Sequence, residues 1–244
     1  MTGDHVNVSQ LKEMAALCAV DCVQSGMIVG LGHGSTAHYA VCRISKLLRD
    51  GILRDILCVP CSAAVEKEAT ELGIPLTTLD EHPEVDVTID GADEIDPELN
   101  LIKGGGGALL HEKIVAQASR REIIIADESK LSPRLGVRRA VPVEVIPFGW
   151  RTQAQFLESL GAQVSVRLDT RGNPFITDEG NYILDCRFDP AAGLPDLAGR
   201  ISSRAGVVEH GLWLGMATDV IVAGARGIRH LKKGTDKSRL DIRR

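Results

Sequence analysis

Four short polar clusters in the sequence carry residue types that bind anions or move protons. Each follows an apolar run that we expect to form a strand. The clusters are residues 30–36 (GLGHGST), 90–94 (DGADE), 103–107 (KGGGG) and 127–130 (DESK). In an open parallel sheet, ligands bind outside the carboxyl ends of the strands. We therefore expect the fold to bring the four clusters together at one edge of a sheet.

The first cluster has the composition of an anion-binding turn between a strand and a helix. Its glycines allow a sharp turn, after which the N–H groups near Ser35 and Thr36 point outward at the positive end of the helix. The spacing matches neither the phosphate loop of nucleotide hydrolases nor the GxGxxG pattern of dinucleotide binders. We favour a phosphate site over the alternative, which is a tight turn with a hydroxyl cap.

The second cluster places the carboxyl groups of Asp90, Asp93 and Glu94 within five residues. Neighbouring carboxylates repel one another unless a partner neutralises them, and such clusters often do acid–base chemistry. A divalent metal would also neutralise them, but no histidine lies at a suitable spacing, and Lys103 can balance the charge. The remaining alternative is a solvated turn with a capping aspartate.

Four glycines in a row, residues 104–107, follow Lys103. A structural reason for them is hard to find, because each glycine costs conformational entropy on folding. Before a helix, such a run presents several N–H groups that stabilise an anion, including one formed during a reaction. Glu112 lies about one turn into the following helix and, when ionised, can accept a proton. The alternative for Glu112 is an ordinary exposed helical side chain.

Together the clusters supply an anion-binding helix terminus, a carboxylate pair, a lysine beside N–H donors, and a base. Abstraction of a proton next to a carbonyl in a small phosphorylated metabolite requires these groups. The sequence therefore favours an enzyme that moves a proton on such a metabolite.

The elements that must position these clusters alternate between strand and helix over the first 130 residues. One helix is expected from a cap at Ser9 to a C-terminal glycine at Gly26. The other expected helices span residues 37–48, 63–73 and 112–118, and the expected strands span residues 27–29, 57–59, 85–90 and 123–126. This alternation predicts an α/β fold with a mostly parallel sheet that is covered on both faces.

Beyond about residue 138 the pattern changes to that of a small α+β unit. Strands are expected at residues 141–147, 162–168 and 182–185, helices at residues 153–160 and 197–203, and a final strand at residues 220–224. We therefore expect residues 1–137, completed by residues 211–244, to form one domain, with residues 138–210 inserted as a second. The polar tail, residues 232–244, is typical of a frayed surface terminus.

The composition excludes several classes of protein. The chain has 244 residues, with 28 Lys and Arg against 33 Asp and Glu, a net charge of −5. This acidity, with only four Phe, two Trp and two Tyr, argues against nucleic-acid binding through basic patches or base stacking. The apolar runs are too short for a transmembrane helix, and the first five residues lack the features of a secretory signal. We expect a cytoplasmic protein that binds neither membranes nor nucleic acid.

The six cysteines lie mostly in apolar runs. Cys58 and Cys61 have the spacing of a redox or zinc pair, but no second pair or histidine cluster is near them in the sequence. We therefore expect reduced, buried cysteines that act as small hydrophobic residues.

In combination, the polar clusters resemble those of the type A ribose-5-phosphate isomerases. The matching stretches are residues 30–37 (GLGHGSTA), 90–96 (DGADEID), 103–113 (KGGGGALLHEK), 126–130 (ADESK), 143–147 (VEVIP), 177–185 (TDEGNYILD) and 206–217 (GVVEHGLWLGMA). The resemblance, which extends to about residue 231, implies a Rossmann-like domain with a smaller α+β domain inserted. It also implies aldose–ketose isomerisation of ribose 5-phosphate and ribulose 5-phosphate in the pentose phosphate pathway, without a metal or a cofactor. Members of this family are commonly dimers or tetramers, so we expect a homodimer or a homotetramer.

The resemblance implies a role for each matching residue. Glu112 would be the base that moves a proton between C1 and C2 through an enediolate, while Lys103 would hold the charge on oxygen. Asp90 and Asp93 would grip sugar hydroxyls and assist ring opening or proton movement between oxygens. The substrate-binding residues would be His33, Gly34, Ser35, Thr36, Gly91, Ala92, Gly104, Gly105, Gly106 and Lys130, with the phosphate at Ser35 and Thr36.

One residue of the first cluster, His33, departs from the family pattern, which usually has threonine there. An imidazole changes its charge near neutral pH, so we expect a pH-dependent affinity for substrate. Two other classes of protein remain. A non-catalytic sugar-phosphate sensor would require an output module, but no helix-turn-helix or basic patch precedes Gly26. A CoA transferase, generally a larger protein, would use Glu112 as a covalent nucleophile.

Overall fold

The computed structural model describes residues 7–189, 193–232 and 242–243. The chain divides into two compact units, and each is described by itself below. The first comprises Met1–Ala92, Ile114–Lys130 and Met216–Arg244, and the second comprises Asp93–Lys113 and Leu131–Gly215. The domain division expected from the sequence, with boundaries after residues 137 and 210, stays a prediction. No helix of the described residues is both long and apolar enough to cross a membrane.

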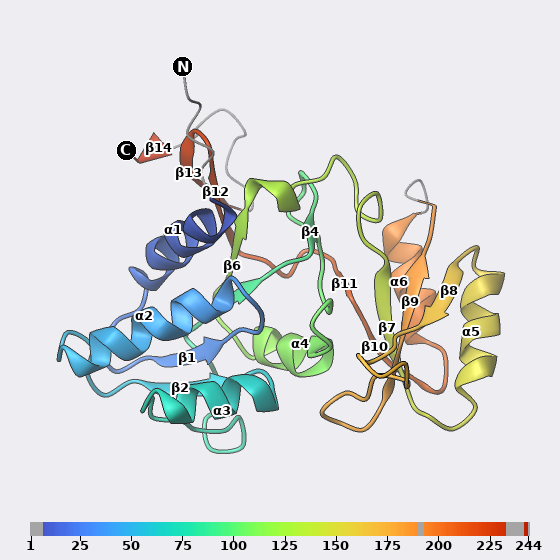
Figure 1. Cartoon of the computed structure of the whole chain (residues 1–244), viewed down its shortest axis with the longest axis horizontal. Coiled ribbons are helices and arrows are strands. Elements are labelled where there is room, and N and C mark those ends of the chain that lie inside the picture. Colours follow the sequence, from blue (N-terminus) through green and yellow to red (C-terminus); the bar gives the residue numbers. More distant parts are fainter. Residues whose placement is uncertain (1–6, 190–192, 233–241, 244) are drawn as a thin grey trace. The chain divides into compact units, whose positions relative to one another are not determined.

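A seven-stranded sheet forms the centre of the first unit, in the order β14-β13-β12-β6-β3-β1-β2 (Figure 1). Its strands are β1 (Ile28–Leu31), β2 (Leu57–Pro60), β3 (Val87–Gly91), β6 (Glu122–Asp127), β12 (Asp219–Gly224), β13 (Gly227–Lys232) and β14 (Ile242–Arg243). The strands from β12 to β2 in this order run parallel, and β13 and β14 extend the sheet in antiparallel pairing. The predicted α/β fold with a mostly parallel sheet is therefore confirmed.

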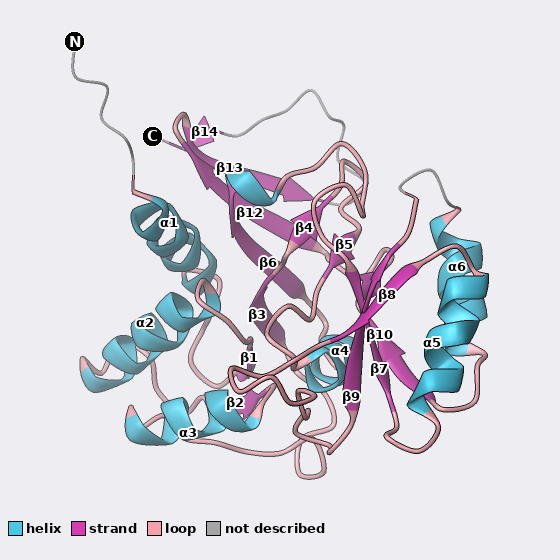
Figure 2. Cartoon of the chain, turned by 45° about the vertical axis from the view of Figure 1, so that its right-hand side comes forward, coloured by secondary structure: helices cyan, strands magenta, loops and turns pink. Residues whose placement is uncertain are grey.

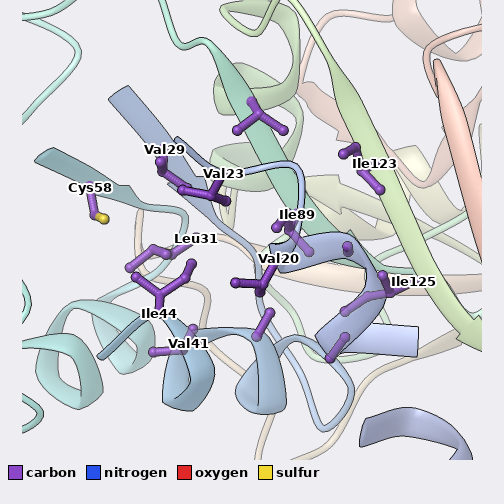
Figure 3. Close-up of a cluster of buried hydrophobic side chains, with 14 of the residues drawn as sticks. Val20, Val23, Val29, Leu31, Val41, Ile44, Cys58, Ile89, Ile123 and Ile125 are labelled. Atoms are coloured by element: carbon purple, nitrogen blue, oxygen red, sulfur yellow. The ribbon is translucent and has the colours of Figure 1, made fainter. Parts of the chain in front are cut away.

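One face of this sheet is covered by helices α1 (Val8–Val20) and α2 (Ala37–Arg49), which also pack against each other. Alternate residues of a strand point to the same face, so β1 and β6 each contribute two residues to this core. Figure 3 shows the resulting cluster of buried side chains, which includes Val20, Val29, Leu31, Val41, Ile44, Ile89, Ile123 and Ile125. Helix α3 (Ala63–Glu71) follows β2 and contacts it.

The opposite face is covered by the last part of helix α4 (Leu109–Gln117), where Val115 packs with Val59, Cys61 and Val85. Gly30 makes this packing possible, because a Cβ there would lie 1.9 Å from Thr88 Oγ1 and 2.9 Å from Val115 Cγ1. A helix thus packs on each face of the sheet, and coverage of the whole second face stays a prediction.

The ends of α1 differ from the prediction. Asn7, not Ser9, is the N-cap, because its side chain accepts the N–H of Ser9 and shares a capping box with Gln10. The helix ends at Val20 with Asp21 as its C-cap, so Gly26, at φ +84°, belongs to a later turn.

The predicted tail also needs correction. Most of it, like the first five residues, lies outside the described residues. Within it, Ile242 and Arg243 pair with β13, so these two residues are not frayed.

The second unit contains a four-stranded antiparallel sheet in the order β10-β7-β9-β8. Its elements are β7 (Val141–Val145), α5 (Trp150–Ser159), β8 (Gln163–Val166), β9 (Tyr182–Arg187), α6 (Leu194–Ser202) and β10 (Val207–His210). In Figure 2, α5 and α6 lie beside this sheet, and their buried residues Leu157, Leu197 and Ile201 join its apolar core. The α+β character expected for this part of the chain is present, although β10 was not predicted.

A small antiparallel sheet, β11-β5-β4, completes the second unit. Its strands are β4 (Glu94–Ile95), β5 (Leu101–Ile102) and β11 (Leu212–Trp213). Glu94 is fully buried, and its carboxylate accepts the backbone N–H groups of Gly136, Arg138 and Arg139 at 3.0–3.1 Å. Glu94 therefore fixes the chain between η1 (Glu128–Lys130) and β7.

Candidate active site

Three of the four predicted clusters lie at the carboxyl edge of the seven-stranded sheet. They follow β1, β3 and β6, and β3 pairs with both of the other strands. The prediction of a common edge is therefore confirmed for residues 30–36, for Asp90 with Gly91 and Ala92, and for residues 127–130. It is wrong for residues 103–107, which follow β5 in the small antiparallel sheet.

The loop after β1 exposes backbone donors at the start of α2. Gly34 has φ +106°, a conformation that favours glycine, and its carbonyl accepts the N–H of His38 at 3.0 Å. The N–H groups of Ser35, Thr36 and Ala37 donate to no acceptor among the described residues. The Thr36 hydroxyl makes no capping hydrogen bond. This geometry supports an anion site and disfavours the hydroxyl-capped turn.

A lysine that the sequence did not single out reaches this loop. Lys12, on α1, donates from Nζ to Ser35 Oγ at 2.8 Å. Its ammonium group therefore adds positive charge beside the N-terminus of α2, where an anion is already favoured. No spacing rule connects Lys12 to Ser35, because α1 and the loop meet only through tertiary packing.

Asp90 is fully buried at the end of β3 and orders the loop after β1. Its Oδ1 accepts the backbone N–H of His33 at 3.0 Å and that of Gly91 at 2.6 Å. Gly32 is required here, since a Cβ at that position would lie 2.3 Å from Asp90 Oδ1. The imidazole of His33 is held by Ser62, with Nδ1 and Oγ 2.9 Å apart. The solvated-turn interpretation of Asp90 is therefore wrong.

The fourth cluster combines structural carboxylates with one half-buried lysine. Asp127 accepts the N–H of Ser129, and Glu128 accepts the N–H of Ala225 while its side chain covers Gly224. Lys130 ends η1, and its ammonium group makes no hydrogen bond or ion pair within the described part of the chain. Lys130 is thus the member of this cluster that is left to bind a ligand at the sheet edge.

In the second unit, Lys103 and Glu112 form a buried ion pair. Nζ and Oε1 are 3.1 Å apart, and the side chains are only 2% and 5% exposed. The Lys103 ammonium also lies 4.9 Å from the ring centroid of Trp213, itself fully buried. An ordinary exposed glutamate at position 112 is therefore excluded. Burying a carboxylate and an ammonium group costs desolvation energy, which only good geometry and further contacts repay. A buried pair of this kind is therefore retained for other contacts or for function.

Lys113, the next residue on α4, fixes the start of that helix. It pairs with Glu209 at 2.7 Å and donates to the backbone carbonyls of His210 and Leu212. Burial lowers the pKa of Lys113, while Glu209 opposes that shift. These contacts hold the turn of α4 that carries Glu112.

The glycine run has structural reasons that the sequence did not reveal. Gly104 and Gly107 have φ of +104° and +88°, and a Cβ on Gly107 would lie 2.5 Å from the ring of Phe175. Gly105 donates its N–H to Asp93 at 2.7 Å, and a Cβ there would lie 2.7 Å from the same carboxylate. Among the described residues, the N–H of Gly106 and those of the first two residues of α4 donate to no acceptor. These unused donors are suited to an anion.

Arg167 supports the same loop and was also missed. It donates to the carbonyls of Gly104 and Gly105 at 2.7 and 3.1 Å, and it forms a two-pronged ion pair with Asp185. Arg167 binds carbonyl oxygens of the loop and therefore leaves its N–H groups unoccupied. Asp93 and Arg167 together fix the conformation of residues 104–106.

The prediction of buried cysteines holds for half of them. All six are free thiols; Cys58, Cys61 and Cys186 are buried, whereas Cys18, Cys22 and Cys42 are half-buried. Burial raises the pKa of the Cys58 thiol to about 12, so it stays protonated at neutral pH.

The sequence and the fold have counterparts among known isomerases. Residues 57–227 match the family model described as ribose 5-phosphate isomerase A (phosphoriboisomerase A). The chain is 58% identical over 220 residues to the ribose-5-phosphate isomerase A of Chloroflexus aurantiacus, which covers 90% of this chain and 92% of the relative.

Two solved structures are similar over almost the whole chain. The ribose 5-phosphate isomerase of Plasmodium falciparum has a TM-score of 0.90 and 44% identity, covering 93% of this chain and 100% of that one. A D-ribose-5-phosphate isomerase in complex with phospho-erythronic acid has a TM-score of 0.90 and 37% identity, covering 93% and 99%. The fold is thus that of a sugar-phosphate isomerase. More specifically, the chain belongs to the ribose 5-phosphate isomerase A family.

Proposed function

We propose that the chain is a ribose-5-phosphate isomerase, which interconverts ribose 5-phosphate and ribulose 5-phosphate in the pentose phosphate pathway. Family membership supports the reaction, and the buried Lys103–Glu112 pair is the observation that carries the mechanism. A solved relative in complex with phospho-erythronic acid supports a phosphorylated, anionic substrate.

Glu112 is the base in this mechanism. Its carboxylate removes the proton from C2 of the open-chain aldose, and the electron pair moves through a C1–C2 double bond onto the carbonyl oxygen. The proton on the C2 hydroxyl moves to the C1 oxygen, which leaves the negative charge on the C2 oxygen. Glu112 then returns its proton to C1, and the ketone forms at C2. The oxidation of C2 from alcohol to ketone is balanced by the reduction of C1 from aldehyde to alcohol, so the reaction requires no external oxidant or reductant.

The enediolate charge requires a positive or N–H-rich partner at the reacting oxygens. Lys103 supplies an ammonium group beside Glu112, and Gly104, Gly105 and Gly106 form the loop with unused N–H donors. Preorganised donors of this kind stabilise developing charge without reorganising during the reaction. Asp93 contributes by holding Gly105 and by accepting a sugar hydroxyl.

The phosphate of the substrate is assigned to the loop after β1. Gly34, Ser35 and Thr36 offer backbone N–H groups and two hydroxyls at a helix N-terminus. Lys12 and Lys130 add positive charge from α1 and η1. Asp90, with Gly91 and Ala92 beside it, is assigned to the sugar hydroxyls and to ring opening or the proton transfer between oxygens.

The test is conversion of ribose 5-phosphate by purified protein in excess EDTA, comparing the parent with Glu112→Gln. Glutamine keeps the size of the side chain but accepts a proton poorly, so kcat should fall by about 10²–10⁴-fold while sugar-phosphate binding survives. Glu98→Gln, in an exposed turn of the same unit, is the matched control and should retain full activity.

Three results would contradict this assignment. Full activity of Glu112→Gln would show that Glu112 is not the base. Binding without turnover in the parent favours a sensor, and an acyl-CoA-dependent mass increase on Glu112 favours a CoA transferase. Activity that disappears in EDTA and returns with a divalent ion would show a metal requirement.

A cytoplasmic location and assembly as a homodimer or homotetramer are further parts of the proposal, and both rest on the family resemblance. Sedimentation equilibrium of the purified chain distinguishes a monomer from either assembly. A monomeric, fully active protein would remove the proposed assembly and leave the catalytic assignment intact.

A further inference from the structure

A second cluster of chemically competent side chains lies on helices α2 and α3, outside the residues assigned above. His38 and Cys42 are four residues apart on α2, and Glu68 is on α3. Residues at this spacing share one helix face, which is the arrangement that lets two side chains bind one metal ion. The nitrogen, sulfur and oxygen atoms of the three side chains all lie within 4.8 Å of one another.

The separation of the sulfur and one nitrogen is that of two ligands of one tetrahedral ion. Cys42 Sγ lies 3.6 Å from His38 Nε2. A zinc ion bound at about 2.3 Å to sulfur and about 2.0 Å to nitrogen holds these atoms about 3.5 Å apart at a tetrahedral angle. Because Sγ is also 3.9 Å from Nδ1, it faces the ring and not the in-plane lone pair of Nε2, so a side-chain rotation of His38 or Cys42 must accompany binding of the ion.

Glu68 lies where it can fix the orientation of the His38 ring. Its carboxylate contacts His38 Nδ1, the other ring nitrogen. A metal-binding histidine commonly donates its second N–H to a carboxylate, which fixes the ring and strengthens the nitrogen ligand. The pairing of Nδ1 with Glu68 leaves Nε2, the nitrogen nearer to sulfur, to bind the ion.

Exposure at the cluster allows an ion to enter. The His38 side chain is 54% exposed and that of Glu68 is 28% exposed, while Cys42 is half-buried. Burial and the neighbouring Glu68 raise the pKa of the Cys42 thiol, so the thiol is not activated as a free nucleophile. A bound cation is the partner that would stabilise its thiolate form.

We propose that His38 Nε2 and Cys42 Sγ, with Glu68 behind the imidazole, form a binding site for a divalent transition metal that prefers nitrogen and sulfur, with zinc as the best match. Water completes the coordination. The ion takes no part in the isomerisation, so the metal site and the proposed function are tested independently of each other.

The experiment is a titration of metal-free, full-length protein with Co²⁺ followed by Zn²⁺. Cobalt bound to a thiolate gives a sulfur-to-cobalt charge-transfer absorption, so the parent should develop this band to one equivalent per chain and lose it when zinc displaces cobalt. Cys42→Ser should abolish the band, and His38→Gln should weaken zinc binding by about tenfold or more. Circular dichroism checks that each variant is folded.

Cys22→Ser is the matched control, because Cys22 is another partly buried cysteine of the first unit. It should retain the band and the affinity of the parent. Absence of a charge-transfer band in the parent, or a band that survives in Cys42→Ser, would overturn the proposal. His38→Gln has an exposed position and tests the site even if Cys42→Ser fails to fold.

Discussion

The loop after β1 and the loop after β5 look alike in sequence but are built in opposite ways. Both lead into a helix, and both contain a glycine in the same unusual conformation, with φ of +106° at Gly34 and +104° at Gly104. A Cβ on Gly34 would have no neighbour within 4 Å, whereas a Cβ on Gly104 would lie 2.9 Å from Leu109 Cβ and 3.3 Å from Pro142 Cγ.

The difference extends to the charges near each loop. The first loop exposes Gly34 and Ser35, and the ammonium group of Lys12 contacts it at Ser35. The second loop is fixed by Asp93 and Arg167 and lies next in sequence to Lys103, whose ammonium is buried against Glu112. Both loops are held by a carboxylate distant in the sequence, Asp90 for the first and Asp93 for the second. The second loop also follows directly on a buried ion pair, so damage there should cost both stability and activity.

The largest predicted effect comes from Lys103→Met. Removing the ammonium that faces a 5% exposed Glu112 should lower the free energy of unfolding by about 3–5 kcal/mol. It should also lower kcat by about 10²–10³-fold, because a donor to the developing oxyanion is lost. In the first loop, Ser35→Ala should raise KM and cost about 1 kcal/mol or less. Urea unfolding and steady-state kinetics measure both.

A double variant separates the two losses at this pair. Lys103→Met with Glu112→Gln removes both charges, so most of the lost stability should return while activity stays absent. If Lys103→Met unfolds at the same urea concentration as the parent, the buried pair does not contribute to the free energy of unfolding. The two loops would then differ in their effect on catalysis and not in their effect on stability.

The next largest effect compares the two glycines directly. Gly34→Ala should cost about 1–2 kcal/mol, since an alanine is strained at this φ but meets no neighbour. Gly104→Ala should cost about 1–3 kcal/mol more, because the methyl group meets Leu109 and Pro142 as well. Thermal and urea unfolding of the two variants give the difference. Equal costs would show that backbone strain, and not packing, decides both positions.

What could be predicted from the sequence follows the same contrast. The strand, turn and helix at residues 28–49 are local in sequence, so their type and their exposed N–H groups were predictable from residue types alone. The alternation of strand and helix patterns over the first 130 residues also predicted the parallel sheet. Glu112 was predicted as a base from its place after the glycine run, but its burial was not.

The second loop was less predictable because its supports are distant in the sequence. Strands β4, β5 and β11 are two residues long, too short for a periodic pattern, and Leu101 pairs with Trp213 from far along the chain. Arg167 and Lys12 act through contacts of this kind, which no spacing rule reveals. Glu94, grouped with Asp90 by proximity in sequence, turned out to bind backbone N–H groups elsewhere.

The buried ionisable groups of the second unit predict that its stability depends on pH, and His210 is the residue responsible. Burial, followed by the nearby Lys113, lowers the pKa of His210 from 6.5 to about 4. The neutral ring accepts the N–H of Leu212 at Nδ1, so Nε2 carries the hydrogen and donates to Ser202. Between these two pKa values the unfolded chain binds a proton that the folded chain does not, so stability falls as pH falls.

His210→Asn tests this effect, because its side-chain oxygen can still accept the N–H of Leu212. The parent should lose about 2 kcal/mol more than the variant between about pH 6.5 and about pH 4.5, measured by urea unfolding at each pH. Carboxylates titrate in both proteins and cancel in the difference. If the free energies of unfolding of the two proteins change in parallel with pH, His210 does not contribute to the acid sensitivity of the second unit.

The smallest predicted effect returns to the first loop and His33. The hydrogen bond from this residue to Asp90 comes from the backbone N–H, so His33→Thr keeps it and should leave the fold and kcat unchanged. The imidazole is held by Ser62 at the edge of the loop, and a ring N–H there can donate to an anion. Loss of the imidazole should therefore raise KM by about two- to fivefold, the size of one lost hydrogen bond. Steady-state kinetics of His33→Thr and the parent measure the change. An unchanged KM would show that the first loop binds its anion through backbone N–H groups and lysines alone, which would sharpen its contrast with the loop after β5.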